Sequence, residues 1–600
     1  MYRTATRPIA APRPLAHSTK DLLYWLALLL ALSMPFEVVR PLLSSGPILW
    51  TNLELLVAGT ALVLGIHLLQ AVADGRGIRA SLRHLPWRLA APALLFLGLA
   101  TLSAILAPTN VLGALKVVTR FAMGLYAFAL VIFVADRAER VEGLLWAIAA
   151  GAGLSALLGW FEALGWAAST PLLALFKEAP SRVGGELRVS GSFQYATVAS
   201  MFFEATTPLA LVLAVTARAR AARWLALLVA LLGSTLVVET LTRSGMVTLA
   251  LVLVGMLLIG LFSGRGSAMR GLVRPVVTTL LALVLVVALL VTRSATFRTR
   301  LTTENDLNWY GATYTVPTSL ELESGAAETI TVTAHNTGQA TWQAEGENPF
   351  ALGYQWLTED GQLAGAKDHY EVALPRNVAP GTSIELTVPL DPALPPGNYR
   401  LEWSMLQQNI LWFSDREVPA AETAVSVERA TAPTTPPPPL AVRPRTEAES
   451  LQPTFPPTVG RRDLWRAGWL MWRERPLLGV GPGNFRHLYG QYLGMADWDD
   501  RIYANNLYVE FAATLGILGA AAFGWLVLNV LARALRAFLR PPGAVARVWL
   551  VGLAAGAGAF LLHGLLDYFL EVVSLYLLFW ITLGLIVALS RLASVEEGAI

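Results

Sequence analysis

One stretch of the chain combines residue types that could do chemistry on a phosphate. Residues 476–510, PLLGVGPGNFRHLYGQYLGMADWDDRIYANNLYVE, carry three closely spaced glycines, then basic, aromatic and acidic residues, and then an apolar run. Glycines let backbone N–H groups approach a phosphate closely. The segment GVGPG, 479–483, lacks the GxxxxGK[ST] pattern, and Pro482 stands where a dinucleotide fingerprint needs helix, which excludes a nucleotide site. The glycines therefore predict either a simple tight turn or a phosphate cradle.

Other candidate groups are few. His563 and Asp567 are four residues apart in an apolar run, which places both on one face of a helix. We expect them to bond to each other or to a neighbouring helix as structural polar contacts. The chain has no cysteine, which excludes disulfides, thiol chemistry and cysteine-bound metal. Since histidine and carboxylate residues nowhere show metal-site spacing, we expect neither a metal nor a cofactor.

The composition indicates which elements must position these residues. Of the 600 residues, 55% are hydrophobic and 14% are charged, with a mean hydropathy of +0.53, whereas soluble proteins carry roughly 25% charged residues. We predict an all-α polytopic membrane helix bundle of about twelve transmembrane helices, because apolar runs of bilayer length recur along the chain. The predicted spans are residues 21–37, 52–73, 89–108, 115–135, 142–165, 196–216, 222–240, 244–263, 273–292, 507–531, 547–568 and 572–590.

The distribution of basic residues predicts an orientation. Arginine and lysine concentrate in the tail 1–20 and in every second loop after it, while the intervening short loops hold few. The positive-inside rule then places both termini on the cytoplasmic side and the long loop 293–505 outside. The membrane bundle is predicted in two parts, 21–300 and 506–600.

Residues 301–430 change character. Segments such as ETITVTAHN, SIELTVPL and NYRLEWSML alternate apolar and polar residues, with turn signals between them. We predict an inserted extracytoplasmic β-sandwich, immunoglobulin-like, which resembles modules appended to bacterial cell-surface proteins. Such modules act as spacers or mediate contacts, so this domain is a candidate for contact with a glycan or a protein. Tyr354, Trp356, Trp403 and Trp412 could stack on sugars, although we expect core packing for most of them.

Two segments connect the β domain to the last membrane helices. The linker 431–460 is rich in proline, which predicts a stiff, extended chain without a core. In the outer loop 461–505, the segment RRDLWRAGWLMWRERP places Trp465, Trp469 and Trp472 on one helical face. We predict a short helix lying in the membrane interface. A helix packed against the outer domain is the alternative.

Several stretches together resemble the O-antigen ligase and O-antigen polymerase family of bacterial envelopes. RPLLGVGPGNF, a tyrosine and NNLYVEFAATLGILG follow a tryptophan-bearing helix, as PLxGxGxGxF and HNxxLxxxxExGxxG do in the family. RVSGSF (188–193) is similar to its RxxGxF element, TRSGMVTLAL (242–251) to its SRxxxL element, and HGLLDYFL (563–570) to a late-span element. The resemblance covers 1–300 and 461–600, and the β domain looks like an insertion into the family's large outer loop.

The resemblance implies a metal-independent membrane glycosyltransferase of the bacterial cytoplasmic (inner) membrane. Family members transfer an oligo- or polysaccharide from a polyprenyl-diphosphate carrier to an envelope acceptor: a lipid, as in lipopolysaccharide, for a ligase, or another glycan for a polymerase. The implied partners are this lipid-linked donor, a lipid or glycan acceptor and the membrane, with no nucleic acid. Ligase, polymerase and protein-glycosylating activities stay open. So do an inactive glycolipid-binding scaffold, a lipid-linked glycan transporter, and an adhesion module tethered by the bundle.

The same resemblance places the donor site at the outer mouths of the spans. A guanidinium stays charged and can bind phosphate bidentately, which suits a departing diphosphate. The alternative for Arg243 is a structural pair with Glu239, four residues earlier on the same helical face. The expected diphosphate-binding residues are Arg188, Arg243, Arg486, Gly481 and Gly483.

Asn505 departs from the family pattern. It stands where the family has a histidine that activates or positions the acceptor, Thr514 replaces the motif glutamate, and the family's HPN-like element reads QYA at 194–196. Asparagine can hydrogen-bond but cannot take a proton near neutral pH. Three explanations stay open. Another residue acts as the base, the acceptor hydroxyl needs little help from a base, or catalysis is lost. The expected catalytic residues are Arg188, Arg243, His487 and Asn505, and the further candidate bases are Asp497, Asp499, Asp500 and Glu510.

Overall fold

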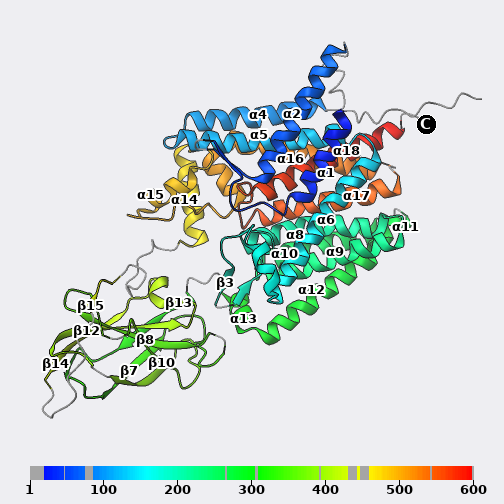
Figure 1. Ribbon diagram of the computed structural model, residues 1–600. Helices are drawn as coiled ribbons and strands as arrows, with labels where there is room; N and C mark the ends of the chain where they lie inside the picture. The colour runs from blue at the N-terminus through cyan, green and yellow to red at the C-terminus, as the bar shows by residue number, and fades with distance from the viewer. Residues whose placement is uncertain are drawn as a thin grey trace, which may run out of the picture.

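The computed structural model shows a bundle of long helices and a separate β domain (Figure 1). It describes the whole chain except residues 1–18, 46–47, 75–85, 185, 264–265, 304–307, 347, 366, 391–392, 430–441, 446–458, 541–542 and 598–600. Most of the predicted cytoplasmic tail and of the proline-rich linker therefore lies outside the described residues.

Eleven helices among the described residues are long and apolar enough to cross a membrane. They correspond to all the predicted spans but the first, whose helix α1 (Thr19–Ser33) has 15 residues. The chain is thus a multi-pass membrane protein. The helices are α2 (Asn52–Ala73), α4 (Trp87–Ile105), α5 (Val111–Val134), α6 (Ala138–Ala163), α8 (Ala196–Thr216), α9 (Arg220–Glu239), α10 (Arg243–Phe262), α11 with α12 (Ser267–Gly271 and Val273–Arg293), α16 (Leu507–Leu539), α17 (Ala544–His563) and α18 (Val573–Glu597).

Helices α8 and α18 form the centre of the bundle, whereas α2 and α12 lie at its edge. Helix α8 packs against α9 and α17, and α18 packs against α5, α16 and α17. Close packing depends on small residues: a side chain at Gly556 would meet the backbone oxygen of Ala205, and one at Gly584 would meet that of Phe128. Small residues let backbones approach where lipid offers no hydrophobic driving force between helices.

The β domain consists of two sheets inserted between α13 (Ala295–Thr302) and α14 (Arg461–Glu474). Trp356 and Trp403 are at most 2% exposed and Tyr354 is 3% exposed, which confirms core packing for these three rings. One sheet has the strand order β15 (Val442–Arg443), β9 (Leu363–Ala364), β8 (Phe350–Thr358), β12 (Gly397–Gln407), β14 (Ala421–Glu428) and β6 (Ser319–Glu323), with β10 (Tyr370–Ala373) and β13 (Leu411–Trp412) beside β8 and β12. The other has the order β11 (Ser383–Leu390), β7 (Glu328–Asn336) and β5 (Ala312–Thr315).

The β domain contacts the bundle at one end, which we call the β-domain end. Gln407 Nε2 donates to the carbonyl of Gly184, in the turn between β3 (Ser181–Val183) and β4 (Glu186–Arg188), at 3.5 Å. Trp309 Nε1 donates to Thr303 Oγ1 at 2.8 Å. Helices α14 and α15 (Phe485–Leu493) lie at this same end (Figure 1).

Helix α14 packs against α15 and α16. Its buried residues include Leu464, Ala467 and Met471, while Trp469 is 56% exposed. The exposed tryptophan agrees with an amphipathic helix at an apolar surface. Its place in a membrane interface stays a prediction.

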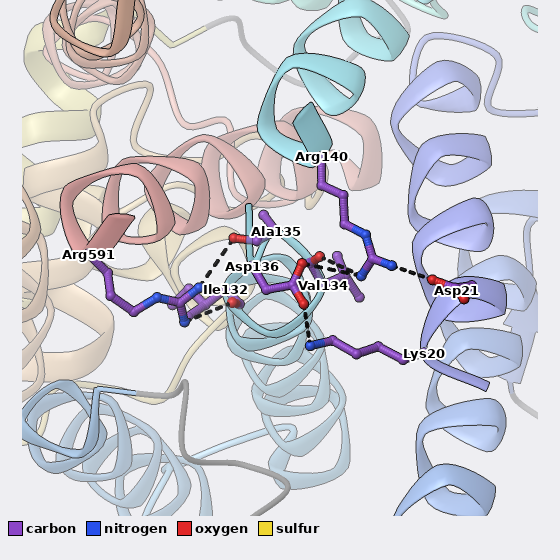
Figure 2. A network of polar contacts seen from close by, with 8 residues as sticks. All are labelled: Lys20, Asp21, Ile132, Val134, Ala135, Asp136, Arg140 and Arg591. Carbon is purple, nitrogen blue, oxygen red and sulfur yellow. Dashed lines mark hydrogen bonds and ion pairs between the residues drawn. The ribbon is translucent and has the colours of Figure 1, made fainter. Parts of the chain in front are cut away.

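A network of charged side chains joins four helices at the opposite end (Figure 2). Asp136, between α5 and α6, accepts from Lys20 of α1 at 2.6 Å and faces Arg140 of α6 at 3.4 Å. Arg140 also bonds to Asp21, and Arg591 of α18 donates to the carbonyls at the end of α5. Since α1, α5 and α18 each have one end in this network, their other ends all lie at the β-domain end.

Candidate active site

The glycine-rich segment forms a turn that is bonded to a break in α16. Gly479, Gly481 and Gly483 all have positive φ, and so does Gly516, the one non-helical residue inside α16. The N–H of Val480 donates to Ala513 O and that of Gly481 to Thr514 O, both at 2.9 Å. Because the Gly481 N–H is used in this way, it does not point at a ligand. The glycines instead allow close approach, since a side chain at Gly479 would overlap the Thr514 backbone.

Asn505 and Asn506, which stand where the family motif has histidine and asparagine, differ in conformation and contacts at the start of α16. Asn506 is the N-cap: its side chain accepts from Tyr508 N and Val509 N and donates to Leu565 O at 2.7 Å. Asn505 has φ 46 and is half-buried, a left-handed conformation that asparagine tolerates well. Thr514 is buried, and its hydroxyl donates to Glu510 O at 2.6 Å.

The 188–195 loop is held by a buried ion pair. Lys177 and Glu162 bond to each other, with side chains 4% and 6% exposed. Glu162 Oε2 accepts from the N–H groups of Ser190 and Gly191, at 3.2 and 2.7 Å. Burying two charges is costly unless both are paired and hydrogen-bonded. The pair therefore fixes the loop that delivers Gln194 and Tyr195.

A pocket of about 480 Å³ opens where these elements meet, at the β-domain end. It is lined by residues of the loop after α1, the start of α2, α5, the segment after α7 (Thr170–Leu173), the 188–195 loop with the start of α8, α15, the loop between α15 and α16, and the loop before α18 with the start of that helix. Its charged lining residues are Glu37, Arg120, Arg486, Arg501 and Glu571. Three guanidinium groups in one pocket fit an anionic ligand carrying more than one charge.

The three arginines are held differently. Arg120, inside α5, donates to the backbone carbonyl of Glu571 at 3.2 Å. Arg486 lies 3.9 Å from the Glu571 carboxylate and over the Tyr503 ring, and within the described part of the chain its buried Nε has no hydrogen-bond partner. Arg501 is 83% exposed and binds both carboxylate oxygens of Asp499.

Arg188 and Arg243 lie beside a different feature, the break between α9 and α10. Arg188 Nε donates to Thr240 O at 3.1 Å, and Arg243 donates to Thr303 O. Neither residue lines the pocket. The expectation that Glu239 and Arg243 share one helical face is wrong, because α9 ends at Glu239, α10 begins at Arg243, and Leu241 between them has φ 53.

The candidate bases lie outside the pocket lining. His487 on α15 is 3.6 Å from Asp500, and its pKa is lowered by burial and by Arg486, with Asp500 opposing. Glu510 is 1% exposed and accepts from Ala504 N at 3.0 Å. The role of either residue as a base stays a prediction.

The late-span histidine has partners that the sequence did not indicate. His563 Nδ1 is 2.8 Å from Glu204 Oε2 on α8, and His563 Nε2 is 3.1 Å from Ser244 Oγ on α10. The prediction of a contact to a neighbouring helix is thus confirmed. No hydrogen bond of His563 to the Asp567 side chain is found among the described residues.

Sequence reasoning missed four charged residues of the pocket lining: Glu37, Arg120, Arg501 and Glu571. The predicted spans 21–37 and 115–135 absorbed the first two as part of apolar runs. Each is one of two charges in its predicted span, beside Asp21 and Lys116 respectively, and a charge within an apolar run usually marks a functional or paired group. That signal could have found them.

Part of the site, with Arg486 and Arg501, lies in a segment that matches a known family. The family model for O-antigen ligase matches residues 443–524, which include α14, the glycine turn, α15 and the first half of α16. Among curated proteins, none matches this chain. This match indicates a function of the membrane glycan ligase or polymerase type. Residues 443–524 form an O-antigen ligase domain, within a multi-pass helix bundle that an inserted β domain interrupts.

Proposed function

We propose that the chain transfers an oligo- or polysaccharide from a polyprenyl-diphosphate carrier to an envelope acceptor, in the pocket at the β-domain end. The observation that carries this proposal is that Arg120, Arg486 and Arg501 come from three separate elements and line one pocket. The pocket adjoins the O-antigen ligase domain, which supplies Arg486 and Arg501.

The arginines fit the charge that develops in the reaction. When the sugar leaves its carrier, the diphosphate takes the bonding electron pair and negative charge grows on its oxygens. Groups already fixed at that position stabilise the transition state without reorganising. The unpartnered Nε of Arg486 is a buried donor for which a phosphate oxygen would be a partner.

Arg120 supports the same proposal by its location. It belongs to a helix long enough to span the membrane, yet it is only half-buried and faces the pocket. Charges in membrane helices face cavities or partners and mark substrate pathways. We assign Arg188 and Arg243 the task of holding the break between α9 and α10, and we place the diphosphate on the pocket arginines.

We further propose that the β-domain end is extracytoplasmic and that the membrane is the bacterial cytoplasmic membrane. The opposite end carries Lys20, Arg140 and Arg591 (Figure 2), and the charge of Arg137 also acts there on Asp136, as the positive-inside rule expects of the cytoplasmic side. The pocket then faces the leaflet that presents the lipid-linked donor after export. A lipid acceptor and a glycan acceptor are both compatible with it.

A second candidate function is an inactive glycolipid-binding scaffold, which Asn505 favours because the family's acceptor histidine is replaced. In that case the pocket would bind the donor and form no product. Covalent transfer separates the two functions.

The test is transfer in proteoliposomes from a polyprenyl-diphosphate-linked oligosaccharide, offered mixed envelope lipids and glycans. We expect Arg120→Gln and Arg486→Gln to slow transfer about 30-fold or more, as for loss of ~2 kcal/mol or more of charge pairing. Arg376→Gln, on an exposed turn of the β domain, is the matched control. Unchanged rates in both pocket variants would disprove the assignment of the diphosphate to this pocket.

A further inference from the structure

Hydrogen bonds from Asn52 to the residues before and after Glu37 hold the backbone of Glu37 at the pocket. It lies in the loop between α1 and the short strand β1 (Leu43–Ser45). The amide of Asn52 clamps both neighbouring residues: Nδ2 donates to Phe36 O at 2.8 Å, and Oδ1 accepts from Val38 N at 3.0 Å. The peptides on either side of Glu37 are thus fixed, which holds its backbone at the pocket that its side chain lines.

Asn52 is itself well anchored. It is the first residue of α2, whose start is closed by a reciprocal capping box between Thr51 and Glu54. Such a box satisfies two backbone donors that the helix leaves free. The loop that carries Glu37 is also tied to the rest of the β-domain end, since Val39 N donates to Leu175 O at 2.9 Å. Glu37 is therefore positioned by two rigid elements.

The surroundings of the Glu37 carboxylate bring its pKa close to neutral pH. Burial raises its pKa to about 7, and the charge of Glu54 on α2 acts in the same direction. The backbone of Ser574, at the start of α18, hydrogen-bonds to it, and this bond and Arg120 on α5 both lower the pKa. Glu571 and Arg486 line the same pocket. A carboxylate tuned in this way can take up and release a proton at physiological pH.

We propose that Glu37 is the general base that takes the proton of the acceptor hydroxyl, and that Asn52 is its positioning residue. This inference rests on the transferase function proposed above. The acceptor oxygen forms a bond to the anomeric carbon while the bond from that carbon to the diphosphate oxygen breaks. The electron pair leaves with the diphosphate, toward the pocket arginines. The proton passes to Glu37 and from there to water.

The other acids and bases fit this task less well. An asparagine at position 505 cannot take the proton, and His487 does not line the pocket. Glu571 faces Arg486 at 3.9 Å and serves that arginine as a counter-charge. Glu37 thus takes the role that the family resemblance would give to the missing histidine, from a different element.

The experiment compares wild type, Glu37→Gln and Glu178→Gln for transfer in proteoliposomes across about pH 5 to 9. Glu178 is an exposed carboxylate after α7 (Thr170–Leu173), outside the pocket, and serves as the matched control. Wild type and Glu178→Gln should show kcat rising with pH through about 7. In Glu37→Gln, kcat should no longer rise with pH, and it should be about 10²- to 10⁴-fold lower than in wild type. The KM for the donor should be unchanged.

Two further variants separate catalysis from structure. Glu37→Asp keeps the carboxylate, so it should retain the rise with pH at a lower kcat. Asn52→Ala frees the loop, so it should lower kcat and leave the donor KM unchanged. Wild-type activity in Glu37→Gln, or a wild-type kcat that does not change with pH, would overturn the inference and leave the transferase function standing. No product from wild type would instead defeat the proposed function, and the inference with it.

Discussion

His563 on α17 and Glu204 on α8 bond to each other at 2.8 Å with no exposure of either side chain. Ser200 and Ser244 complete the chain, at 2.7 Å from Glu204 and 3.1 Å from His563. This chain joins α8, α10 and α17 next to the break that carries Arg243.

Removing one partner of this buried pair should be strongly destabilising. Glu204→Ala and His563→Ala should each cost about 3–5 kcal/mol, because each leaves an uncompensated buried polar or charged group. The double variant should cost clearly less than the sum of the two, since the residues act as a unit. Thermal unfolding of the four proteins in detergent measures this. Additive effects would show that the two residues do not interact.

The network at the opposite end should make stability depend on pH. Burial acts to raise the pKa of Asp136, but its bond to Lys20 and the charges of Lys20, Arg140 and Arg137 outweigh burial and lower it. A carboxylate whose pKa is lowered by folding stabilises the protein above its unfolded pKa, and this stability is lost as pH falls. We expect the melting temperature of wild type to fall on acidification through the range below about pH 4.

Asp136→Asn tests the origin of this acid sensitivity. It should already be less stable at neutral pH, and it should lose less on acidification than wild type does. Asp368→Asn, in an exposed pair with Arg443 of the β domain, is the control, because exposed pairs contribute little. A steeper acid loss in Asp136→Asn than in wild type would contradict the assignment.

Elements that follow from periodicity could be predicted from the sequence. The membrane helices and the β strands arise from apolar runs and from alternation, which are local patterns. The predicted spans 222–240 and 244–263 also placed a break before Arg243, as the structure does. The expectation that Glu239 and Arg243 share one helical face failed, because Leu241 between them is left-handed, and no local pattern indicated that conformation.

The site was predicted less completely than the fold. Arg486 was predicted and lines the pocket, whereas Arg188 and Arg243 were selected by motif and lie elsewhere. The pocket forms where several segments distant in sequence meet, and such a meeting is a property of the packing. Glu37 illustrates this, because its surroundings come from α2, α5 and α18.

The break in α16 gives a test of the glycine turn. Gly516 has φ 63, and a side chain there would lie 2.3 Å from the Leu477 backbone. Gly516→Ala should therefore cost at least ~1–3 kcal/mol for the left-handed conformation alone, and more for the overlap. Gly524→Ala, in the same helix with open space around it, should be neutral or stabilising by up to ~1 kcal/mol. The yield of folded protein in gel filtration and the melting temperature measure the stability of each variant. Equal yields and equal melting temperatures of the two variants would contradict the structural role of the turn.

The last prediction concerns Asn505. If Glu37 takes the acceptor proton, the wild-type protein transfers glycan without the family's histidine. Asn505→His should then change the transfer rate by no more than about tenfold, which is small beside the effect of losing a general base. The substituted histidine must also adopt φ 46, which asparagine and histidine both tolerate better than most residues. The measurement is product formation by wild type, Asn505→His, and Asn505→His combined with Glu37→Gln. Product from wild type that is lost in the combined variant would show that a histidine at position 505 cannot replace Glu37. Product from Asn505→His and none from wild type would show that the natural chain is an inactive family member, and that its pocket binds the lipid-linked glycan without transferring it.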